Sequence, residues 1–62
     1  MTFDQFISIS EASPFHWEIF GEYNDLRFEG YSEQEAMKLA LEFGRKLELE
    51  ALEYERKLQN ER

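Results

Sequence analysis

Four carboxylates recur at helical spacing near the middle of this 62-residue chain, namely Glu18, Glu22, Asp25 and Glu29. Positions i, i+4, i+7 and i+11 of a helix fall within an arc of roughly 60°, so the four side chains form one acidic stripe. Two interpretations of the acidic stripe stay open. It is either a solvated face that serves solubility, or a docking surface for a basic region of another protein. A metal site is not expected, because carboxylates along one helix face do not converge as Ca²⁺ or Mg²⁺ requires.

Basic side chains gather in two adjacent pairs, which are Arg45 with Lys46 and Arg56 with Lys57. The two pairs are eleven residues apart and therefore lie on one side of a helix. A nucleic-acid-binding helical dimer is the alternative function that they suggest. Acidic residues are interspersed among them, however, and glutamates stand four residues before each lysine, in the orientation that favours ion pairs. We therefore interpret these bases as partners of neighbouring acids, and nucleic acid as an unfavoured ligand.

The sequence offers little for catalysis. It contains a single histidine, His16, and no cysteine, which excludes a thiolate nucleophile and a cysteine-rich zinc site. Glycine-rich phosphate loops and nucleotide-binding fingerprints are absent from it. We therefore expect a protein that is not an enzyme, with no catalytic, cofactor-binding or metal-binding residues.

The charge is strongly uneven along the chain. Seven Lys and Arg against fourteen Asp and Glu give a formal net charge of −7. Residues 1–35 hold eight acids and one base, whereas residues 36–62 hold six of each, so the whole excess lies in the first part. This balance argues against nucleic acid or an anionic membrane as a ligand of the whole molecule. No segment approaches the roughly 18 consecutive apolar residues of a membrane span, and we expect a cytoplasmic protein.

Local signals predict an all-α fold of three helices that position these side chains. A capping box at Thr2 and Gln5 predicts a short first helix over residues 3–10. Ser13 as N-cap and Pro14 as first helical residue predict a second helix over 14–29, which ends before Gly30. A second capping box, which begins at Ser32, and a run of strong helix formers predict a long helix over 33–60, either continuous or hinged at a glycine. We expect a single helical domain over 1–62, folded as a helical hairpin with a short N-terminal helix.

The second helix carries two large aromatic side chains away from its main apolar face, which gives it a second apolar edge. Trp17 and Phe28 point to about the same side of the helix, away from the acidic stripe. Core packing is the interpretation that we favour for them, with an exposed docking role as the alternative.

The long helix predicts self-association. At about 1.5 Å per residue it spans roughly 42 Å, against roughly 24 Å for the second helix, so its far end has no partner within the chain. That end nevertheless keeps apolar side chains on one side, at an eleven-residue repeat. This distal stripe consists of Phe43, Leu47, Ala51, Tyr54 and Leu58. A chain this small, without disulfides, is typically completed by oligomerisation, so we expect a homodimer or higher homo-oligomer built through the distal stripe.

Several segments together carry a resemblance to a known group of proteins. The segments are Ser13-Pro14-Phe15, Trp17-Glu18-Ile19-Phe20-Gly21-Glu22-Tyr23-Asn24-Asp25-Leu26, Gly30-Tyr31-Ser32 and Glu42-Phe43-Gly44-Arg45-Lys46. In them the chain resembles the small early-region proteins encoded between the exonuclease and excisionase genes of lambda-like phages. The resemblance implies a small helical, non-enzymatic protein made early in infection, located in the host cell cytoplasm. It further implies an influence on lytic or lysogenic development through host proteins, and it carries over no site residues.

Overall fold

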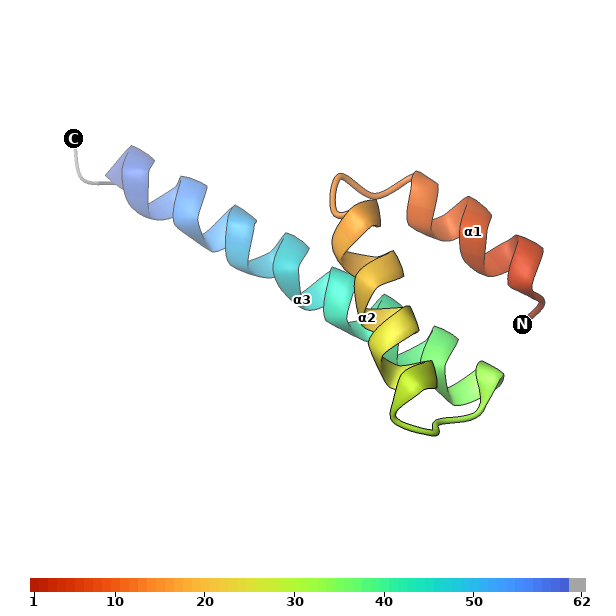
Figure 1. Cartoon of the computed structure of the whole chain (residues 1–62). Coiled ribbons are helices and arrows are strands. Elements are labelled where there is room, and N and C mark those ends of the chain that lie inside the picture. Colours follow the sequence, from red (N-terminus) through yellow and green to blue (C-terminus); the bar gives the residue numbers. More distant parts are fainter. Residues whose placement is uncertain (61–62) are drawn as a thin grey trace.

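Three helices make up the computed structural model, which describes residues 1–60 (Figure 1). They are α1 (Phe3–Glu11), α2 (His16–Phe28) and α3 (Glu33–Asn60). The predicted all-α class is confirmed, since no strand occurs within residues 1–60. The expected domain over 1–62 includes two further residues that lie outside the described part.

The first helix begins at the capping box that the sequence predicts. Thr2 Oγ1 accepts a hydrogen bond of 3.1 Å from the Gln5 N–H, and Gln5 Oε1 accepts one of 2.9 Å from the Thr2 N–H. Two of the otherwise unpartnered amides at this helix end are thereby satisfied. The helix runs one residue beyond the expected end at position 10, and it buries Phe6 and Ser10.

The second helix begins later than predicted. Pro14 is not its first residue, because α2 starts at His16 with Phe15 in the N-cap position. Ser13 Oγ does not cap the helix: it accepts a hydrogen bond of 3.1 Å from the Phe15 N–H and donates one of 2.7 Å to Glu48 Oε1 in α3. The serine hydroxyl thus holds a turn against α3, and residues 14–15 belong to the connection between α1 and α2.

The turn between α2 and α3 follows the predicted chemistry. Gly30 has a φ of +104°, a conformation that side chains with a Cβ rarely adopt. The Gly30 N–H donates to the Arg27 carbonyl (3.1 Å) and the Tyr31 N–H donates to the Leu26 carbonyl (3.0 Å), which is the Schellman arrangement. α2 itself ends at Phe28, one residue before the predicted end. Ser32 Oγ then accepts from the Glu35 N–H (3.2 Å) at the start of α3.

The core lies where α2 packs against the first half of α3, with α1 in contact with both. The buried apolar side chains are Phe6, Ile19, Leu26, Ala36, Met37 and Ala40. Gly44 lies at the closest approach of the two longer helices: an ideal Cβ placed on it would lie 2.5 Å from Ile19 Cγ1 and nearer still to Ile19 Cδ1. The absence of a side chain at this position allows α2 to pack closely on α3.

The third helix continues through Gly44 without a break, over 28 residues. Its second half extends away from α1 and α2, toward the blue end of the chain in Figure 1. Every side chain from position 49 to position 59 is exposed. Across residues 1–60 no helix is both long enough and apolar enough to span a membrane.

Candidate functional site

The acidic stripe lies on the outer side of α2. Glu18, Asp25 and Glu29 are exposed and Glu22 is half-buried. The adjoining side of α2 supplies Ile19 and Leu26 to the core, with Ile19 only 2% exposed. The structure therefore brings the four predicted carboxylates together on one accessible face.

The two large aromatics of α2 are not in the core, which corrects the interpretation favoured from the sequence. Trp17 is 74% exposed and Phe28 is 94% exposed. The physical reason is that α1 and α3 both pack against the side of α2 that carries Ile19, Phe20 and Leu26, so no element within residues 1–60 covers the other edge. Their alternative role as exposed docking aromatics remains.

Two other aromatic rings pack against the indole ring of Trp17. Its ring centroid lies 6.2 Å from that of Phe20 at 81°, and 4.9 Å from that of His16. Phe20 in turn lies 6.1 Å from Phe6, which is fully buried. The Nδ1 atom of His16 lies 3.2 Å from the Ser13 carbonyl oxygen. The indole ring is thus accessible, and its contacts with these rings already restrict its rotamers. It therefore loses less side-chain entropy on binding a partner than a freely rotating side chain would.

Gly21 lies between these two aromatics on the same exposed edge of α2. A Cβ placed on it would meet nothing within 4 Å, so packing within residues 1–60 gives no reason for a glycine here. Glycine in a helix interior costs about 1 kcal/mol relative to alanine. We call the edge formed by Trp17, Gly21, Asn24 and Phe28 the aromatic face. At its middle the helix backbone is open to close approach from outside.

The distal stripe divides into a covered part and an open part. Phe43 and Leu47 are half-buried by the rest of the chain, and Ala51 is exposed. Tyr54 is 65% exposed and Leu58 is 50% exposed. The structure thus places all five predicted residues along one side of α3, with the last three open to a partner.

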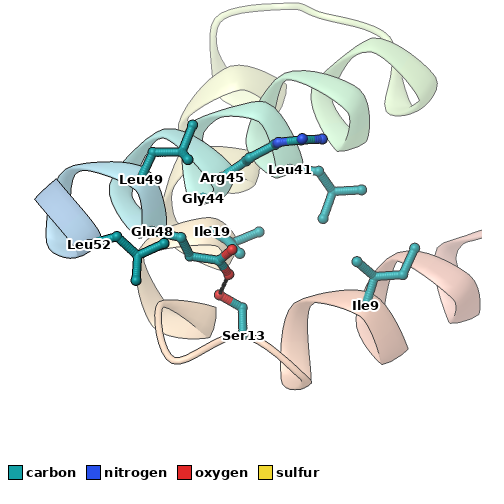
Figure 2. A pocket seen from close by; sticks show the side chains of 9 residues that line it. All are labelled: Ile9, Ser13, Ile19, Leu41, Gly44, Arg45, Glu48, Leu49 and Leu52. Atoms are coloured by element: carbon teal, nitrogen blue, oxygen red, sulfur yellow. Dashed lines mark hydrogen bonds between the residues drawn. The ribbon is translucent and has the colours of Figure 1, made fainter.

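A groove that the sequence did not reveal lies between the end of α1 and the middle of α3 (Figure 2). Its apolar lining includes Ile9, Leu41, Leu49 and Leu52, and the hydrogen bond from Ser13 to Glu48 closes one side. The lining residues come from α1, the connection that follows it, α2 and α3. The sequence hints at this groove in only one respect: Ile9 and Ile7 lie on opposite sides of the first helix, so both cannot enter the same core. This pattern does not show which residues Ile9 contacts.

A second groove lies between the connection that precedes α2 and the exposed half of α3. Pro14 and Phe15 line it from one side, and Ala51 and Leu52 from the other. The carboxylates at its border are Glu48 and Glu55. We call it the Phe15 groove, and it shares Ala51 with the distal stripe.

The basic side chains of α3 lie open to solvent. Arg45, Lys46, Arg56 and Lys57 are all exposed, and Arg45 borders the groove of Figure 2. In the part of the chain that the structure describes, no three His, Cys, Asp or Glu side chains gather to hold a metal ion. No protein-family model, curated protein or solved structure matches the chain.

Proposed function

We propose that this protein is a small non-enzymatic regulator or adaptor that binds another protein through the aromatic face and the acidic stripe of α2. The observation that carries the proposal is the exposure of Trp17 and Phe28 on either side of Gly21, beside a line of carboxylates. Exposed tryptophan is typical of the residues that dominate binding energy at protein interfaces.

The acidic stripe and the aromatic face together indicate which kind of protein surface would bind them. The carboxylates of the acidic stripe attract a basic surface and speed its approach, whereas the two aromatic rings supply apolar contact area. Gly21 lets a backbone or a small side chain of the partner come close to the axis of α2. The resemblance to early-region phage proteins supports a host protein as that partner, bound in the host cytoplasm, with an effect on lytic or lysogenic development.

A matched set of variants tests this proposal. The tagged native chain is compared in a bacterial host lysate with Trp17→Ala/Phe28→Ala, with Glu18→Lys/Asp25→Lys, and with the control Glu42→Lys/Glu53→Lys. The control makes the same change of charge on exposed positions of α3. Retained proteins are quantified by mass spectrometry, and circular dichroism shows that each variant is folded.

One host protein should be retained by the native chain and the control and lost by both α2 variants. Gly21→Ala provides a sharper test, because it should raise the melting temperature of the chain and yet weaken retention of the same protein. Identical retention by all variants would refute the proposed binding surface and leave the acidic stripe as a solvated face.

Self-association through the distal stripe is the second part of the proposal, in which the helical hairpin is completed by a homodimer or higher homo-oligomer. The exposure of Tyr54 and Leu58 supports it. Light scattering coupled to size exclusion, over a dilution series, tests it. The native chain should be larger than one copy, and Leu47→Glu/Leu58→Glu should dissociate or unfold it. A native chain that stays monomeric at every concentration would overturn this part.

A further inference from the structure

We propose that two copies pair antiparallel through the distal stripe, with Leu47 opposite Leu58 of the second copy and Ala51 opposite its Tyr54. The inference rests on the proposed self-association and adds the orientation, the register and the groove that the second copy fills.

The spacing of the distal stripe carries the first step. From Leu47 the apolar residues follow at intervals of four, three and four positions, through Ala51 and Tyr54 to Leu58. This order of intervals is the same in both directions along the helix. A twofold axis midway between positions 52 and 53 therefore brings each of these four residues of one copy opposite one of the same four residues of the other, and Phe43 lies outside the paired segment. Such self-complementarity is what a twofold-symmetric interface requires.

The sizes of the side chains carry the second step. In an antiparallel pair each Tyr54 faces an alanine, whereas a parallel pair would place Ala51 against Ala51 and Tyr54 against Tyr54. The large residue next to the small one fills space evenly in the antiparallel arrangement, as close packing demands.

The Phe15 groove can accommodate the side chain of Tyr54 from the second copy. The groove has a volume of about 510 Å³ and opens beside Ala51, with Pro14 and Phe15 on its far side. The ring of Tyr54 from the second copy enters this groove, which its own chain cannot fill from its exposed position. Glu48 and Glu55 border the groove and can accept a hydrogen bond from the tyrosine hydroxyl. By symmetry the pair contains two such contacts.

The charge distribution favours the same orientation. Residues 1–35 of each copy carry a net charge of −7, whereas the remaining residues are neutral overall. An antiparallel pair places the two acidic ends far apart, and a parallel pair would place them side by side, where they repel. Along one edge of the interface, Glu50 faces Lys57 of the second copy. Along the other edge, Glu48 faces Glu55, a like-charge contact that the hydrogen bond from Ser13 to Glu48 and the tyrosine hydroxyl both offset.

The antiparallel pair also has a consequence for binding. It presents two copies of the aromatic face and the acidic stripe, one near each end of the assembly. A partner with two binding sites, or two partners on one assembly, would then be held by both copies with higher avidity than by one.

Disulfide trapping tests the orientation directly, since the native chain has no cysteine. Leu47→Cys and Leu58→Cys chains, with tags of different mass, are mixed in a glutathione redox buffer. In the antiparallel pair, position 47 of one copy and position 47 of the other are offset by eleven residues along the helix axis, or roughly 16 Å. A disulfide needs Cα atoms about 4.4–6.8 Å apart, so it cannot join them. Glu42→Cys mixed with Leu58→Cys is the matched control, because Glu42 is exposed on the opposite side of α3.

The expected result is a disulfide between the two different chains, and none when either variant is oxidised alone. Disulfides within a single variant, Leu47→Cys with itself or Leu58→Cys with itself, would show a parallel pair and overturn the inference while leaving self-association intact. Crosslinking no greater than the control, in a sample that light scattering shows to be dimeric, would overturn the interface. A monomeric sample would instead overturn the proposed self-association.

Discussion

The close approach of Gly44 to Ile19 leads to a prediction about the sign of a single substitution. In an isolated helix, Gly44→Ala would stabilise the chain by about 1 kcal/mol through helix propensity. In the folded chain the added Cβ would lie 2.5 Å from Ile19 Cγ1, which is too close for any van der Waals contact. Both atoms that the added Cβ would meet belong to the side chain of Ile19, which is 2% exposed and lines the groove of Figure 2, so the methyl group forces Ile19 out of its present rotamer or moves α2 away from α3. Overpacking of this kind costs about 1–3 kcal/mol, so Gly44→Ala should destabilise the native chain by about 1 kcal/mol.

The same substitution should change sign once the isoleucine is truncated. Ile19→Ala by itself should lower the free energy of unfolding by about 2–5 kcal/mol, because it removes buried methyl and methylene groups and leaves a cavity. In that background the new methyl at position 44 enters the cavity without a clash. Gly44→Ala should then stabilise by about 1–2 kcal/mol, from helix propensity and from one more buried carbon. The coupling between the two positions is therefore about 2–3 kcal/mol.

Urea unfolding followed by circular dichroism measures all four chains of this cycle. A Gly21→Ala background should raise the stability of each chain by the same amount, because a Cβ at position 21 would meet nothing within 4 Å and therefore contacts neither Ile19 nor position 44. The protein concentration must be held constant, since the proposed self-association would contribute to the apparent stability. If Gly44→Ala stabilised both backgrounds by the same amount, the two sites would be independent and the inferred close packing of α2 on α3 would be wrong.

Three further substitutions test individual contacts by the same urea assay. Ser10→Ala should raise the free energy of unfolding by about 1 kcal/mol, because the buried Ser10 Oγ finds no hydrogen-bond partner among residues 1–60; a loss of stability would reveal a hidden partner. Gly30→Ala should lower it by about 1–2 kcal/mol, because its φ of +104° is strained for a residue with a Cβ, and an unchanged value would contradict the left-handed turn. Ser13→Ala should lower it by about 1 kcal/mol through loss of the 2.7 Å bond to Glu48, and Glu48→Gln, which still accepts, should cost less.

The ends of most helices follow from short stretches of sequence. The capping box at Thr2, the glycine at position 30 and the serine at position 32 act on backbone groups within five residues of themselves. Chemistry of such short range is readable without a fold. The start of α2 is the exception, because the Ser13 hydroxyl donates to Glu48, a residue 35 positions away. No local rule specifies that contact, and α2 begins at His16 rather than at the predicted Pro14.

Some features of the candidate site follow from local sequence, and others depend on tertiary packing. Helical periodicity alone placed Glu18, Glu22, Asp25 and Glu29 on one side of α2, and the same periodicity aligned the distal stripe. Periodicity also gave α2 two apolar edges, however, and could not decide which of them would be covered. Only the positions of α1 and α3 decided this, because both pack on the edge that carries Ile19. Trp17 and Phe28 are left exposed because residues 1–60 form no further helix that packs over them.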